Sequence, residues 1–245
     1  MVIWMTRQAM IRIGIVACLI LFTAVIFLNE IPSSRTWTHW TLPLSGKVIA
    51  LDAGHGGADG GAVSRSGVIE KDLNLAIVLY LRDYLQQSGA IVLLTREGDY
   101  DLALPETKGY ARRKTEDLLK RADQVSNQRA DLAISIHMNS IPSPRWSGAQ
   151  TFYSTENAEG KRLATDIQSE LRSMLGNTER IAQKADTVYL LKTLKMPTAL
   201  IEVGFLSHPK EANLLADEEY QRKVAASIYR GILKFASGQS DKPVL

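Results

Sequence analysis

The sequence predicts a single α/β domain in which helices cover both faces of a mostly parallel, twisted sheet, preceded by an N-terminal transmembrane anchor or signal segment. From Lys47 onward, short β-branched apolar runs alternate with longer segments of helical periodicity, and no internal repeat interrupts them. This alternation is typical of parallel strands joined by right-handed crossovers. The predicted parts are an anchor or signal segment at 1–30, a linker at 31–45, the main domain at 46–237 and a tail at 238–245.

The N-terminal segment has the composition of a membrane anchor or signal segment. Arg7 and Arg12 precede the stretch from Ile13 to Leu28, which carries no charge. Its length is long for a signal-peptide core and slightly short for a full span. No small-x-small cleavage site follows, so we favour an uncleaved anchor over a removed signal peptide. The preceding arginines predict a cytoplasmic N-terminus and an extracytoplasmic body.

The first half of the domain is predicted as strand, helix, strand, helix, strand. The run at 47–52 is a strand, and 71–87 is a helix because Leu73, Ile77, Leu81 and Leu85 share one face. Ser88-Gly89 ends that helix, and a second strand follows at 90–95. A polar stretch then leads to a charged helix at about 112–127 and a third strand at 132–136.

The second half continues the pattern with further strands and amphipathic helices. Residues 151–154 predict a short strand, and 158–175 a helix through Leu163, Ile167 and Leu171. The apolar run 199–203 is the last predicted strand, and 218–235 the closing helix.

Composition excludes several classes of protein. A formal net charge of +3 over 245 residues, without a basic run interleaved with aromatics, indicates no nucleic-acid partner. Cys18 is the single cysteine, so neither an intramolecular disulfide nor a thiolate metal cluster can form. The glycine-rich stretch from Gly54 does not complete a dinucleotide fingerprint, and no Gly-Lys-Ser/Thr motif is present.

Three predicted strands end in ionisable side chains among small residues. His55 follows the first strand, His137 the third, and Glu202 the last. Because ligands bind at the carboxyl ends of strands in open α/β sheets, we expect these side chains to converge. Glu70 opens the first helix, where a carboxylate is favoured electrostatically.

Two neutral imidazoles, a carboxylate and an open fourth position make a catalytic zinc site of the hydrolase kind. A second carboxylate outside the ligand set can take a proton from water and pass it to a leaving nitrogen. Glu70 suits the first role and Glu202 the second. Spacing alone leaves the metal site open, because no His-Glu-x-x-His pair exists.

Four blocks in order, DAGHGG, EKDLNL, SIHMNS and IEVGFLS, resemble the signature segments of zinc-dependent N-acetylmuramoyl-L-alanine amidases of type 3. The resemblance implies that His55, Glu70 and His137 ligate Zn²⁺ and that Glu202 is the catalytic base. It also implies hydrolysis of the amide between the lactyl group of muramic acid and L-alanine in peptidoglycan. A short, anchored chain without wall-binding repeats most resembles the germination-specific type, which acts in spore-cortex maturation and germination.

The resemblance sets further expectations. Met138 stands where the family usually has a small residue, which predicts a bulkier rim beside His137. Only 141–149 separates the second histidine block from the next strand, so an inhibitory helix is not expected there. The longer stretch after Arg96, about 99–117, could form a lid or a partner surface, and an activating protein partner is possible.

Several polar residues have a structural interpretation beside the functional one. His208 is expected to belong to a helix start with Ser207 as N-cap rather than to bind zinc. Asn139 could orient a loop or touch substrate, and Asp52 could support the first ligand or form a turn. Arg121 and the charges at 112–120 are expected on a solvated helix face, and His39 in the linker.

Two other functions remain open from the sequence. One is a zinc peptidase that cuts within the peptide stem, and the other is a non-catalytic wall-binding protein that keeps the fold.

Overall fold

The computed structural model describes residues 6–28 and 42–238. The chain divides into two compact units, Met1–Thr41 and Leu42–Leu245. Most of the predicted linker, His39 within it, and residues 239–245 of the predicted tail lie outside the described residues.

Within the first unit, α1 (Arg7–Leu28) is the helix expected from the apolar run. The segment Arg7–Val25 has a mean hydropathy of 2.1 and is long and apolar enough to cross a membrane. None of this segment is buried against protein, as expected for a helix whose apolar surface faces lipid or a targeting machinery.

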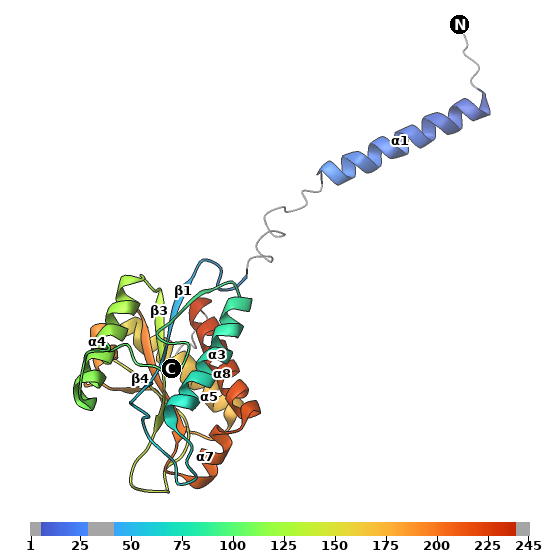
Figure 1. Cartoon of the computed structure of the whole chain (residues 1–245). Coiled ribbons are helices and arrows are strands. Elements are labelled where there is room, and N and C mark those ends of the chain that lie inside the picture. The colour runs from blue at the N-terminus through green and yellow to red at the C-terminus, as the bar shows by residue number, and fades with distance from the viewer. Residues whose placement is uncertain (1–5, 29–41, 239–245) are drawn as a thin grey trace. The chain divides into compact units, whose positions relative to one another are not determined.

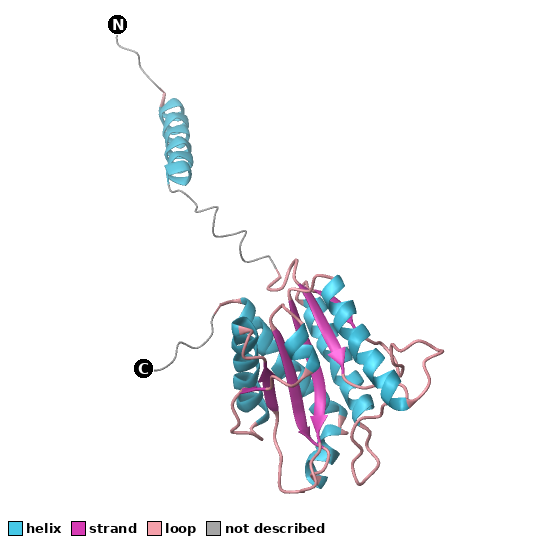
Figure 2. Cartoon of the chain, turned by 90° about the vertical axis from the view of Figure 1, so that its left-hand side faces the viewer, coloured by secondary structure: helices cyan, strands magenta, loops and turns pink. Residues whose placement is uncertain are grey.

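The second unit is built on one six-stranded sheet in the order β2-β1-β3-β6-β4-β5. Its strands are β1 (Val48–Ala53), β2 (Ile91–Leu94), β3 (Leu132–Asn139), β4 (Gln150–Tyr153), β5 (Gln183–Lys184) and β6 (Thr198–Phe205). The four neighbouring strands β2, β1, β3 and β6 run parallel to one another, whereas β4 runs antiparallel to β6. Arrowheads of neighbouring strands point to the same lower edge in Figure 2.

Helices cover both faces, which confirms the predicted α/β class. On one face lie α3 (Glu70–Gln87), α5 (Ala158–Leu175) and α8 (Glu218–Ala236), and on the other lie α4 (Tyr110–Asn127) and α6 (Tyr189–Thr193). Figure 1 shows α4 across the sheet from α3, α5 and α8. The short α7 (Pro209–Leu215) follows β6.

Side chains along each strand alternate between the two faces of the sheet, and each face has its own apolar core. Ile49 and Leu51 of β1 pack in the large core with α3, α5 and α8, whereas Ala50 faces the smaller core beneath α4 and α6. The parity is the same in β3, where Ile134 and Ile136 face the large core and Ala133 the small one. Polar side chains of β1, β3 and β6 therefore fall together on the α4 face.

Four elements differ from the sequence prediction. β3 and β6 continue past His137 and Glu202, because these residues pair with each other across the sheet. The two-residue β5 and the five-residue α6 are too short to show a periodicity.

The N-cap prediction for α7 is wrong. His208, not Ser207, caps it: His208 Nδ1 accepts a hydrogen bond from the backbone N–H of Glu211 at 3.2 Å, and Pro209 follows as the first helical residue. Proline at this position lacks the N–H that a helix start leaves unpaired. The imidazole of His208 is thus used in helix capping.

Candidate metal centre and active site

His55 projects from a backbone turn at the end of β1. It adopts a φ of +63°, and Gly56 and Gly57 after it also have positive φ. For a side-chain-bearing residue this conformation is uncommon and must be held by its surroundings. The turn places His55 Nε2 3.1 Å from Glu70 Oε1.

Glu70 is the first residue of α3 and is almost fully buried. Its Oε1 lies 3.2 Å from His137 Nδ1 and accepts a hydrogen bond of 3.0 Å from the backbone N–H of Met138. Its Oε2 accepts a 2.8 Å hydrogen bond from the backbone N–H of Ala62. Burial alone would raise the pKa of Glu70, but hydrogen bonds with His137 and His55 outweigh it and lower that pKa. The carboxylate is therefore held ionised between the two histidines.

Two glycines make room for this cluster. A Cβ added to Gly54 would lie 2.2 Å from Cε1 of the His137 ring. A Cβ on Gly61, which has a φ of +68°, would lie 2.6 Å from Glu70 Oε2. No side chain fits at either position without displacing a member of the cluster.

The donor atoms of His55, Glu70 and His137 have the spacing of ligands around one metal ion. They all lie within 4.8 Å of one another, and the two nitrogen–oxygen separations are 3.1 and 3.2 Å. Ligands at ~2.1 Å from a tetrahedral ion stand roughly 3.4 Å apart. The two rings meet edge to face, 5.1 Å between centroids, so both can present a nitrogen to the same point.

Asp59 orients His55 from the opposite side of its ring. Asp59 Oδ2 lies 2.8 Å from His55 Nδ1, and the carboxylate also contacts Lys114 Nζ at 2.9 Å and the Tyr110 hydroxyl at 2.8 Å. A carboxylate on one ring nitrogen fixes the tautomer and leaves the other free for a metal. Sequence reasoning missed Asp59, although its place four residues after His55 in the glycine-rich loop was a usable signal.

Arg121 is not on a solvated face, as the sequence suggested, but is 2% exposed beneath the His55 turn. It donates hydrogen bonds to the carbonyl oxygens of Ala53 and His55 at 2.7 and 2.6 Å. It also pairs with Asp52 and Asp117, both at 2.8 Å. One face of α4 thus turns inward, which its dense charge pattern conceals. Among the charged residues at 112–120, Arg112 and Lys114 are exposed, Arg113, Glu116 and Lys120 are half-buried and Asp117 is buried, so the predicted solvated face is only partly correct.

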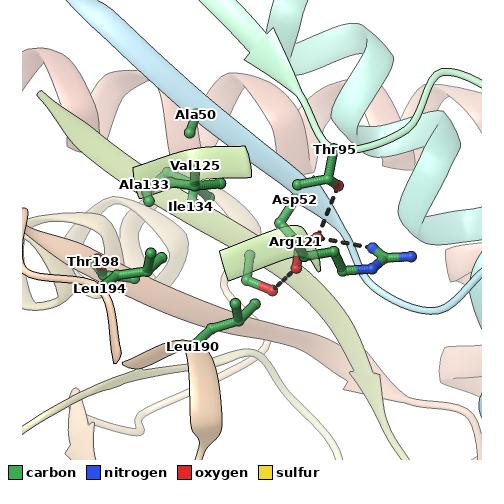
Figure 3. A pocket seen from close by; sticks show the side chains of 11 residues that line it. Ala50, Asp52, Thr95, Arg121, Val125, Ala133, Ile134, Leu190, Leu194 and Thr198 are labelled. Atoms are coloured by element: carbon green, nitrogen blue, oxygen red, sulfur yellow. Dashed lines mark hydrogen bonds and ion pairs between the residues drawn. The ribbon is translucent and has the colours of Figure 1, made fainter. Parts of the chain in front are cut away.

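Asp52 is a buried support for this arrangement. Its carboxylate accepts hydrogen bonds from Thr95, Arg121 and Ser135, and Figure 3 shows Thr95 and Arg121 converging on it. These residues line a cavity of about 10 Å³. Burial opposes ionisation, but Arg121, with smaller contributions from His137 and Ser135, lowers the pKa of Asp52 to about 2. Of the two sequence alternatives, the structure favours support over turn formation.

Arg96 braces the same turn from the other side. It is 1% exposed and donates to the carbonyl oxygens of Ala53 at 2.9 Å, Gly54 at 3.1 Å and Lys71 at 2.7 Å. Two buried guanidinium groups therefore hold the backbone on which His55 stands. Backbone carbonyls as partners leave no trace in a sequence, so this role was not foreseen.

Glu202 lies beside the cluster but outside it. It is paired with His137 in the β3–β6 register, and its Oε2 is buried without a hydrogen-bond partner among the described residues. Burial, with a smaller contribution from Glu70, raises the pKa of Glu202 to about 6. A carboxyl group with this pKa can both accept and release a proton near neutral pH.

A cleft of about 80 Å³ opens beside the two histidines. It is lined by His55 and His137 on the sheet edge and by Lys114, Leu118 and Leu190 on the wall formed by α4 and α6. The prediction that Met138 makes the rim of this cleft bulkier is wrong. Met138 is 3% exposed within the large apolar core, because alternation along β3 turns it away from His137.

Asn139 ends β3, and its carbonyl oxygen accepts a 2.8 Å hydrogen bond from the backbone N–H of Leu206. The segment between β3 and β4 contains no helix, as the sequence predicted for 141–149.

Fold and site together define an α/β enzyme domain with a candidate metal centre at the carboxyl edge of its sheet. The chain belongs to the N-acetylmuramoyl-L-alanine amidase family, which matches it over residues 49–234. This confirms the predicted enzyme class, an amide hydrolase.

The similar proteins and solved structures described next are amidases by name. The germination-specific N-acetylmuramoyl-L-alanine amidase of Bacillus subtilis (strain 168) is 51% identical over 218 residues, covering 89% of this chain and 92% of that protein. The solved CwlD amidase of Clostridioides difficile, in complex with the GerS lipoprotein, is 44% identical with a TM-score of 0.77, covering 78% of this chain and 99% of that one. The amidase AmiC2 of Nostoc punctiforme is 30% identical with a TM-score of 0.69, covering 79% of this chain and 99% of that one.

Proposed function

We propose that this amidase is a zinc enzyme in which His55 Nε2, Glu70 Oε1 and His137 Nδ1 hold the ion and Glu202 is the catalytic base. The observation that carries the proposal is the donor set, two imidazoles and one carboxylate whose donor atoms lie within 4.8 Å of one another, with both imidazoles lining a cleft. This set fits a catalytic zinc site with an open fourth position. Hard-cation sites for Mg²⁺ or Ca²⁺ are built from oxygen ligands instead.

When bound, zinc supplies Lewis-acid polarisation of the scissile carbonyl and acidification of a water molecule. The side chains of this protein orient the ligands and transfer the proton. Asp59 keeps His55 in the tautomer that presents Nε2. Glu202, with its free Oε2, accepts the proton of the attacking water and delivers it to the leaving nitrogen.

The proposed substrate bond is the amide between the lactyl group of muramic acid and L-alanine of peptidoglycan. The likeness to a germination-specific amidase over most of both chains supports action on the spore cortex, in its maturation and in germination. We assign catalysis to residues 46–237.

We infer the cellular location of the enzyme from α1. An apolar helix long enough to span a bilayer, with Arg7 and Arg12 in its N-terminal part, supports an N-terminal anchor with the enzyme on the outer side of the cytoplasmic membrane. The complex of CwlD with a lipoprotein supports a protein partner for this chain, and we propose that this partner activates it.

Muropeptide analysis tests the proposed reaction. The full-length protein, purified in detergent and supplied with zinc, is incubated with cortex peptidoglycan, and products are identified by mass spectrometry. The amidase reaction yields muramoyl residues without stems and intact peptides beginning with L-alanine. Shortened stems still attached to muramic acid would instead indicate a peptidase. No products from protein that holds zinc would point to the activating partner proposed above, and no products from protein that also fails to hold zinc would support a non-catalytic protein.

A further inference from the structure

The sheet continues past Glu202 toward β4, and the residue next to Glu202 there is Gln150. The two are directly opposite in the antiparallel β4–β6 pair. Opposite residues in such a pair project from the same face of the sheet. The next residue, Thr151, contacts α5 on the other face through a hydrogen bond to the Ala164 carbonyl. Gln150 therefore shares the face of the candidate site.

Gln150 holds a guanidinium group at this position. Arg180 Nη1 donates to Gln150 Oε1 at 3.2 Å. The guanidinium carbon lies 5.5 Å from the ring centroid of Trp146 and 5.3 Å from that of Phe205. Trp146 is 50% exposed, so the aromatic face beside Arg180 is open to a ligand. Stacking on aromatic rings keeps the fork of an arginine in one orientation.

Arg180 differs in its charge partners from the cations around the metal ligands. Lys114 pairs with Asp59 at 2.9 Å, and Arg121 pairs with Asp52 at 2.8 Å. Arg180 has no carboxylate oxygen within 4 Å in the part of the chain that the structure describes. The nearby Glu211 carboxylate is occupied by the backbone N–H groups of Gly148 and Phe205, at 2.8 Å each. Arg180 therefore has a charge to offer a ligand.

The spacing fits a short length of peptide. Neighbouring strands are ~4.8 Å apart, so Gln150 on β4 lies one strand spacing from Glu202 on β6, and Arg180 lies beyond it at hydrogen-bond distance from the Gln150 side chain. Extended peptide covers ~3.3 Å per residue. A peptide running from the scissile amide toward β4 therefore passes Gln150, and with it the guanidinium group of Arg180, within its first few residues.

We propose that Arg180, supported by Gln150 and Trp146, binds a carboxylate on the second residue of the peptide stem. This rests on the proposed function, which makes the stem the leaving fragment. An arginine fork matches a carboxylate with two parallel hydrogen bonds, which a neutral carboxamide cannot reproduce. The subsite selects stems with a free acid at that residue.

A matched pair of substrates tests the subsite. One is an N-acetylmuramoyl tripeptide with a free α-carboxylate on its second residue, and the other is the same compound with a carboxamide there. The full-length zinc-loaded protein is expected to prefer the acid by about 10–100-fold in kcat/KM, with the difference in KM, as a charge-assisted hydrogen bond lost with the amide requires. Arg180→Gln abolishes the preference, and Arg180→Lys restores part of it.

Arg145→Gln is the control. Arg145 is exposed one residue before Trp146 and has no ion pair among the described residues, so its variant keeps the full preference. If Arg180→Gln keeps the preference, or if it lowers kcat on both substrates with their ratio unchanged, the subsite is refuted. A wild-type protein that cleaves both substrates equally also refutes the subsite. One that cleaves neither contradicts the proposed function instead.

Discussion

Replacing Arg121 with methionine should destabilise this protein severely, despite the position of Arg121 on a helix that looks solvent-facing in sequence. The methionine fills the volume but removes the hydrogen bonds to the Ala53 and His55 carbonyls and both ion pairs. Removing one partner of a buried ion pair typically costs about 3–5 kcal/mol, because the other charge stays buried without it. We expect Arg121→Met to lower the free energy of unfolding by about this amount.

The assay is urea denaturation of the full-length protein in detergent with EDTA present, followed by circular dichroism. Arg112→Met is the matched control, since Arg112 is exposed on the same helix and should change stability by about 0.5 kcal/mol or less. A double variant with Asp52→Asn should be less destabilised than the sum of the single variants by at least about 1 kcal/mol. Equal midpoints for Arg121→Met and Arg112→Met would refute the buried role.

Three further predictions concern the supports of the site. Gly54→Ala should weaken zinc binding in a chelator competition, because its Cβ would overlap the His137 ring; an unchanged affinity would contradict the close approach. Asp59→Asn should weaken zinc binding about 10–100-fold, since a carboxamide is a poorer partner for His55 Nδ1 than a carboxylate; wild-type affinity in that variant would remove Asp59 from the account. Because the folded-state pKa of Asp52 is about 2, below its usual 3.8, ionised Asp52 stabilises the fold above about pH 4, and about 2 kcal/mol of that is lost as pH falls toward 2. Acid unfolding followed by fluorescence should show this loss in the wild type and not in Asp52→Asn, and identical pH profiles would count against it.

The architecture was predictable because it depends on hydrophobic periodicity. The helix at 158–175 was predicted to the residue, and α3 and α8 within one residue at an end. Periodicity carries no information on strand direction, so the antiparallel setting of β4 was not available from the sequence. It follows from the short connection between β3 and β4 and from the partner that β4 finds in β6.

The candidate site divides in the same way. The convergence of His55, Glu70 and His137 was expected from strand ends and was strengthened by the family resemblance, and the structure brings these three side chains together. The residues that support them were harder to foresee. Arg121 and Arg96 act through hydrogen bonds to backbone carbonyls, and an inward-facing arginine on a polar helix resembles a solvated one in sequence.

Zinc stoichiometry across three forms of the full-length protein separates the metal ligands from the catalytic base. Wild type, Glu202→Gln and His55→Ala are stripped with chelator, reloaded with zinc, dialysed and analysed by atomic emission, alongside their amidase turnover. We expect one zinc per chain and full turnover in the wild type, one zinc without turnover in Glu202→Gln, and loss of both in His55→Ala. Zinc retained at full occupancy by His55→Ala, or lost equally by Glu202→Gln, would contradict the division between ligands and base.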